Sequence, residues 1–270
     1  MVAIFHKSFH DSRRTALWLS IGFGLYVIFI MAFYPAFRDQ ASDFQKLIES
    51  YPKEFLAMFY GGDVEELDLT EPGTFVQTEF ASYSVLILGA IAIAQAFNAF
   101  TNAERDNSLD MLLSLPVSRR RYLLGRVLST ATVMALVLAA CLAGFLVSRF
   151  VWPEFDVSVP NLVLGMVGAW LFVMVCAGYS YLLAVIVPSS RHFAGPIAYL
   201  LLIGPFLIYG IATTIDALKP LQPLMLQHYF NMGKVIRDGV QWGDWAVMAG
   251  MALIYFALAW WLVDRKELGV

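Results

Sequence analysis

Long runs of uncharged, mostly apolar residues divide the chain, and they constrain its fold more than any other feature. At 1.5 Å per residue, about 20 residues cross a hydrocarbon core of roughly 30 Å. Backbone groups in lipid must find their hydrogen bonds within the protein, so each run is expected to be a helix. The runs predict an all-α protein with six membrane-spanning helices, forming one domain over residues 1–270. The spans are expected at about 15–37, 80–103, 123–148, 162–187, 193–215 and 245–263, and Gly204-Pro205 interrupts the fifth.

The composition agrees with a membrane protein and excludes several classes of function. Charged residues make up 14% of the chain, against about 25% in soluble domains. The sequence has no GxxxxGK[ST] phosphate loop, so we do not expect this chain to bind ATP by that mechanism. It also lacks HExxH, CxxC and GxSxG patterns. We therefore expect no catalytic residues, no cofactor or metal bound by this chain, and no nucleic acid partner.

The basic residues predict the orientation of the spans. With both termini on one side, eleven Lys and Arg residues fall on that side and seven on the other. The positive-inside rule then places both termini in the cytoplasm, for a multi-pass protein of the inner (plasma) membrane. Residues 1–14 combine Phe5 and Phe9 with Lys7, Arg13 and Arg14, which is typical of a helix lying in the inner headgroup region.

The two longest segments on the outer side are expected to carry short amphipathic helices. The first covers residues 38–79 and is too long for a plain loop. The second covers residues 216–244, where apolar residues recur at helical spacing before Gly239. These helices either cap the membrane domain or form a hydrophobic gate over an exit path, and the pattern leaves both open.

The connection between the second and third spans, residues 103–122, is the most distinctive stretch. Asn107 can cap a helix start and Asp110 adds negative charge to its first turn. Five of the seven residues from 109 to 115 are apolar, and they cover almost the whole circumference of the helix: Leu109, Met111, Leu112, Leu113 and Leu115. Pro116 ends the helix, and Arg119, Arg120 and Arg121 follow. The stretch is either a loop whose arginines hold the next span in place or a docking helix for a cytoplasmic protein.

This stretch resembles the loop between the second and third spans in permeases of the type-2 exporter family of ABC transporters. The residues that match the family pattern are Glu104, Leu109, Leu112, Leu113, Ser114, Pro116, Val117, Ser118, Arg119, Leu124 and Gly125. Asn107, Ser108, Asp110 and Arg126 depart from it mildly. The C-terminal run from Asp264 to Leu268 also resembles the family's closing Arg-Arg-Asp-Leu.

The resemblance implies a permease subunit of an ATP-driven exporter, with ATP and Mg²⁺ held by a separate ATPase. Two permease subunits, identical or sisters, would pair within membrane lipids above two ATPase subunits and export a hydrophobic or amphipathic substrate. We prefer a homodimer. The residues expected to contact the ATPase are Glu104, Asn107, Leu109, Asp110, Leu112, Leu113, Leu115, Pro116, Arg119 and Arg120.

The second span is the most polar. Gln95, Asn98 and Asn102 share one helical face, and Glu79 lies at the outer mouth. Polar groups in lipid are unfavourable, so this face meets either another helix or a wet pathway. In the family that this sequence resembles, the second and fifth spans line the central cleft. The resemblance therefore adds Tyr199, Phe206 and Tyr209 of the fifth span as candidates for contact with an apolar substrate.

Two other classes of membrane protein are alternatives. A non-transporting scaffold or assembly subunit of an ATPase-linked complex would have tightly packed spans and no cleft. Candidate substrates would stimulate ATP hydrolysis in the exporter and not in the scaffold. A carrier driven by ions predicts buried charge pairs, which the uncharged runs do not supply.

Overall fold

The computed structural model describes residues 2–40, 70–105, 118–187 and 193–265. Helices account for 89% of the described residues and no strand occurs among them, which confirms the all-α class. Within these described residues, six helices are long and apolar enough to cross a membrane, as predicted. Residues 41–69 of the first predicted outer segment lie outside the described residues.

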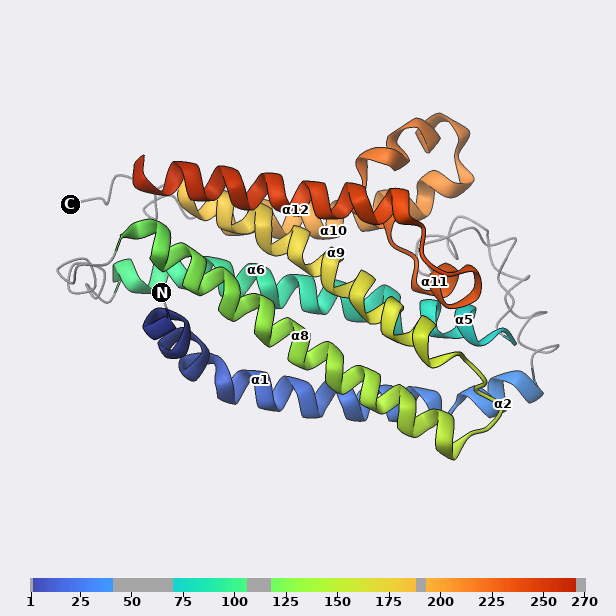
Figure 1. The fold of residues 1–270 in the computed structure, drawn as a ribbon. Coiled ribbons are helices and arrows are strands. Elements are labelled where there is room, and N and C mark those ends of the chain that lie inside the picture. Colours follow the sequence, from blue (N-terminus) through green and yellow to red (C-terminus); the bar gives the residue numbers. More distant parts are fainter. Residues whose placement is uncertain (1, 41–69, 106–117, 188–192, 266–270) are drawn as a thin grey trace.

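The described helices form a bundle of long rods with short helices at one end (Figure 1). In chain order they are α1 (Val2–Met31), α2 (Tyr34–Asp39), α5 (Pro72–Phe75), the π-helix η2 (Val76–Ala81), α6 (Ser82–Arg105), α8 (Arg119–Val151), α9 (Val159–Ile186), α10 (Ala194–Thr214), the 3-10 helices η3 (Asp216–Leu224) and η4 (Leu226–Tyr229), α11 (Met232–Asp238), α12 (Trp242–Leu262) and the 3-10 turn η5 (Val263–Arg265).

Several helices extend beyond the uncharged runs. Helical structure is continuous from Pro72 through η2 into α6, where the sequence predicted a span from residue 80. Similarly, α8 begins at Arg119, before the predicted start at 123. A charged residue marks the edge of the hydrocarbon core, and a helix can continue past it into the headgroup region. The fifth predicted span is one helix, α10, with Pro205 inside it.

The predicted N-terminal interfacial helix is the first part of α1. Figure 1 shows these first turns set at an angle to the rest of α1. They pack on the start of α8, where a Cβ atom added to Gly125 would lie 2.8 Å from a methyl group of Ile4. Further along, Gly144 of α8 approaches Gly24 of α1. α1 and α8 therefore run side by side in the same direction.

The core of the bundle centres on α9. In the most apolar stretch of α9, 67% of the residues are buried, against 22% in the corresponding stretches of α1, α10 and α12. The outer helices expose large apolar side chains such as Trp18, Leu25, Leu200 and Leu253, as expected of surfaces that face lipid or another subunit.

The two ends of the bundle hold different elements. The starts of α1 and α8 and the last turns of α6 and α12 lie together at one end, which we call the proximal end (Figure 1). The distal end holds α2, α5, η2, η3, η4 and α11. Short helices there fill residues 216–238, and Gly239, with φ of 84°, ends α11 as the sequence predicted.

Candidate functional site

The predicted ATPase-docking segment joins α6 to α8 at the proximal end. Seven of its predicted contact residues lie outside the described residues: Asn107, Leu109, Asp110, Leu112, Leu113, Leu115 and Pro116. Glu104 is in α6, but its side chain lies outside the described part of the chain. The two flanks of the segment meet, because the Tyr122 hydroxyl of α8 donates a 2.5 Å hydrogen bond to the Ala99 carbonyl of α6.

Arg119 and Arg120 form the first turn of α8. The structure places Arg120 against the last turns of α12, where its Nε atom lies 2.7 Å from Oδ2 of Asp264. These atoms are not aligned as a hydrogen bond, so the contact is an ion pair. The Arg120 guanidinium also lies 4.3 Å from the ring centroid of Trp260. Arg120 therefore has partners within its own chain, in addition to its predicted contact with an ATPase.

The first turns of α8 touch three other spans. Arg120 contacts α12, Tyr122 contacts α6, and Gly125 lies against Ile4 of α1. A displacement of the chain just before Arg119 would therefore act on α6, α12 and α1 together. The contacts of Arg120 with Asp264 and Trp260 could not be predicted, because these residues are far from Arg120 along the chain.

The polar face of α6 includes Gln95, whose side-chain amide nitrogen lacks a hydrogen-bond partner among the described residues. The Nε2 atom of Gln95 is buried and makes no hydrogen bond to any described residue. Asn98, one turn further, is exposed on the subunit surface, and the side chain of Asn102 lies outside the described residues. Within the described part of the chain, hydrogen bonding between helices therefore does not account for the burial of Gln95 Nε2. Water or a second subunit could supply the missing partners.

The three aromatic candidates on α10 have different neighbours among the described residues. The Tyr199 hydroxyl donates a 3.4 Å hydrogen bond to the Ala90 carbonyl, so Tyr199 links α10 to α6. The ring of Tyr209 lies 6.3 Å from that of His228. Phe206 alone of the three lines the distal pocket described next.

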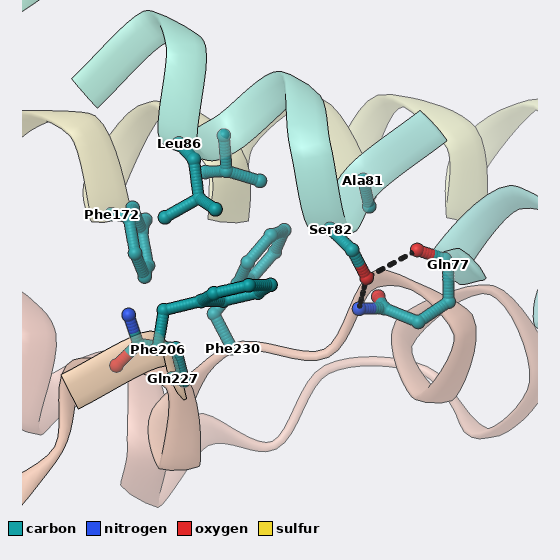
Figure 2. A pocket seen from close by; sticks show the side chains of 9 residues that line it. Gln77, Ala81, Ser82, Leu86, Phe172, Phe206, Gln227 and Phe230 are labelled. Atoms are coloured by element: carbon teal, nitrogen blue, oxygen red, sulfur yellow. Dashed lines mark hydrogen bonds between the residues drawn. The ribbon is translucent and has the colours of Figure 1, made fainter. Parts of the chain in front are cut away.

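The distal pocket lies between η2, α6, α9, α10 and the segment from η4 to Phe230. Figure 2 shows Phe172, Phe206 and Phe230 gathered on one side and Gln77 with Ser82 on the other. Its volume is about 30 Å³, enough for a water molecule but far below what an amphipathic substrate needs. Gln227 also lines it, and its Oε1 atom is buried without a partner among the described residues. The pocket is a narrow, partly polar slot in this conformation.

Gln77 of η2 joins this helix to the start of α11 at the distal end. Its Oε1 atom accepts from the backbone N–H groups of Met232 at 2.7 Å and Gly233 at 3.3 Å, at the start of α11. Gly233 and Gly73 pack backbone to backbone, because a Cβ atom on Gly233 would lie 2.8 Å from the Gly73 carbonyl oxygen. The contact joins residues 155 apart, so the sequence offered no signal for it.

Glu79, predicted at the outer mouth of the second span, lies in η2 and is partly buried. Its backbone carbonyl accepts a 3.1 Å hydrogen bond from the Tyr26 hydroxyl of α1. Glu79 thus lies at the distal end, next to the Gln77 contact and beside α1.

A comparison with protein families matches the whole length of the bundle. The family described as ABC-2 family transporter protein matches residues 2–268. No curated protein matches the chain.

Proposed function

The chain belongs to the ABC-2 family of transporter proteins, and from this premise we propose that it is the permease subunit of an ATP-driven exporter. The family match over residues 2–268 carries the proposal, and it implies association with an ATPase subunit. In the proposed complex two permease subunits pair as a homodimer above two ATPase subunits. ATP and Mg²⁺ bind the ATPase subunits, and the substrate is hydrophobic or amphipathic.

The proposed mechanism is a push on the docking segment. When nucleotide closes the ATPase subunits, they displace Leu109–Leu115, and α8 passes the displacement to its neighbours. The contacts of Arg120, Tyr122 and Gly125 support this route, because they join the start of α8 to α12, α6 and α1. Coupling of this kind requires that nucleotide and substrate bias the same two conformations.

Purification of the tagged chain from its native membrane tests the proposal directly. We expect a partner with a GxxxxGK[ST] loop to co-purify, and ATP hydrolysis by the complex to rise with particular amphipathic compounds. A chain that purifies without any ATPase would contradict the proposal. An ATPase that no candidate substrate stimulates would favour the scaffold alternative.

The orientation gives a separate prediction. A C-terminal reporter that works only in the cytoplasm should be active, and Gly62→Cys should react with an impermeant maleimide added from outside. Cys141 and Cys176 are both buried, so the unsubstituted chain provides a low background. A periplasmic C-terminus together with an unreactive Gly62→Cys would reverse the assignment.

The polar face of α6 gives a prediction about stability and transport. Because Gln95 Nε2 has no partner among the described residues, Gln95→Leu with Asn98→Leu should leave thermal stability of the single subunit unchanged. If the face lines the pathway, the same change should alter stimulation of ATP hydrolysis by amphipathic compounds.

Thr130→Val is the matched comparison for a true helix–helix hydrogen bond. The Thr130 and Tyr181 hydroxyls lie 3.0 Å apart and are buried, so this change should lower stability by about 0.6 to 1.7 kcal/mol. A Gln95→Leu, Asn98→Leu protein that is equally destabilised, with unchanged stimulation, would refute the pathway assignment.

A further inference from the structure

Arg126 belongs to α8 at the proximal end, where its side chain reaches Ser8 of α1 and is only partly exposed. A cation held between membrane helices is unfavourable unless an acidic group or another anion accompanies it. Among the described residues no carboxylate pairs with Arg126, and its polar contacts are all with hydroxyl groups. The structure thus shows a partly buried positive charge without a negative partner in the described part of the chain.

The surroundings hold this guanidinium in one orientation. Its Nε atom donates a 3.1 Å hydrogen bond to the Tyr122 hydroxyl, which itself donates to the Ala99 carbonyl of α6. The guanidinium carbon lies 5.3 Å from the Tyr122 ring centroid. Nη1 lies 3.5 Å from Oγ of the buried Ser8, at the limit of a hydrogen bond. The remaining N–H donors are available for an acceptor approaching between α1 and α8.

The net charge of this end of the two helices is positive. α1 carries exposed Lys7, Arg13 and Arg14 in its first turns, and α8 begins with Arg119, Arg120 and Arg121. Asp11, three residues from Ser8, is the only acidic residue of α1 and α8, and it is exposed. At the same end, Asp264 is paired with Arg120.

The level of Arg126 along the bundle matches that of lipid headgroups. Gly125 packs beside Ile4, so Arg126 is level with the amphipathic start of α1. Trp18, 69% exposed, lies one turn beyond Arg14, and the apolar part of α1 begins there. Tryptophan concentrates at the boundary between headgroups and acyl chains. The arginine therefore sits where the phosphate groups of a membrane leaflet are found.

We propose that Arg126, together with Ser8, binds the phosphate group of an anionic phospholipid where α8 faces α1. Basic pockets between membrane helices bind anionic headgroups in this way. Because the site adjoins the start of α8, a bound lipid would brace the helix that follows the docking segment. The proposal does not depend on transport and goes beyond the proposed function.

The test uses the purified full-length chain, with any ATPase that accompanies it, in a neutral detergent. Short-chain phosphatidylglycerol, short-chain phosphatidylcholine and inorganic phosphate are titrated separately, and bound lipid is counted by native mass spectrometry alongside the melting temperature. We expect phosphatidylglycerol to bind and stabilise the protein more than phosphatidylcholine does. Arg126→Gln should weaken phosphatidylglycerol binding about fivefold, and Arg126→Lys should retain most of it.

Arg149→Gln is the matched control, because Arg149 is at the other end of the same helix and pairs with Asp156 at 3.4 Å. It should leave lipid binding unchanged. The melting temperature in phosphatidylcholine shows whether Arg126→Gln folds, and Ser8→Ala tests the same site without removing charge. Competition by inorganic phosphate would assign the site to free anions as well as lipid. Equal phosphatidylglycerol binding by the parent and Arg126→Gln would overturn the proposal.

Discussion

Replacing Leu112 and Leu113 with Asp is expected to release the ATPase subunit from the purified permease. Each leucine, if buried in a groove on the ATPase, contributes roughly 1.5 to 3 kcal/mol relative to exposure in water. Aspartate removes that contribution and places two unpaired charges in the groove, so little association should survive. The permease itself should still insert and fold, because this segment lies outside the six spans. Co-purification of the tagged permease with the ATPase measures the effect.

The choice of control follows from the contacts at the start of α8. Arg120 pairs with Asp264 and stacks on Trp260, so its removal would disturb the permease as well as any interface. Arg121 is exposed on the same turn. Arg121→Ala should weaken association modestly and more at low salt than at high salt, as expected of a charge at an interface rim. If the Leu112→Asp, Leu113→Asp protein still retained a fully coupled ATPase, the docking assignment would be wrong.

The number and type of the spans could be predicted because hydropathy is a local property. The hydropathy of about 20 consecutive residues identifies each span, and a backbone in lipid has few alternatives to a helix. Gly239 could be predicted to end α11 for the same reason, since a positive φ at a helix end is a local requirement.

Contacts between distant segments could not be predicted. Nothing in the sequence around Gln77 indicates its hydrogen bonds to Met232 and Gly233, because the packing of α5 against α11 brings these residues together. Arg120 is predicted to contact the ATPase because of its immediate neighbours in the sequence, and that contact stays a prediction. Its contacts with Trp260 and Asp264 depend on the last span returning to the start of α8.

Gly144→Leu is expected to destabilise the protein more than the other glycine substitutions named below. A Cβ atom at Gly144 would lie 2.8 Å from the backbone oxygen of Gly24 and 3.0 Å from Cβ of Val27. A backbone atom cannot rotate away, so α1 and α8 would have to separate along their contact. Overpacking of this kind destabilises by about 1–3 kcal/mol or more. The melting temperature and the monodisperse yield of the purified protein measure the loss.

The glycines of these helices also supply a graded control for that prediction. Gly250 of α12 has no atom within 4 Å of its Cβ position, so Gly250→Leu should be tolerated, because leucine favours the helix more than glycine. With alanine in place of leucine, the order should follow the distances. Gly250→Ala should be neutral or stabilising, Gly24→Ala intermediate because its Cβ would meet the Ala140 oxygen at 3.3 Å, and Gly144→Ala the most destabilising. If Gly144→Ala and Gly250→Ala melted at the same temperature, the close approach of α1 and α8 would not be a determinant of stability.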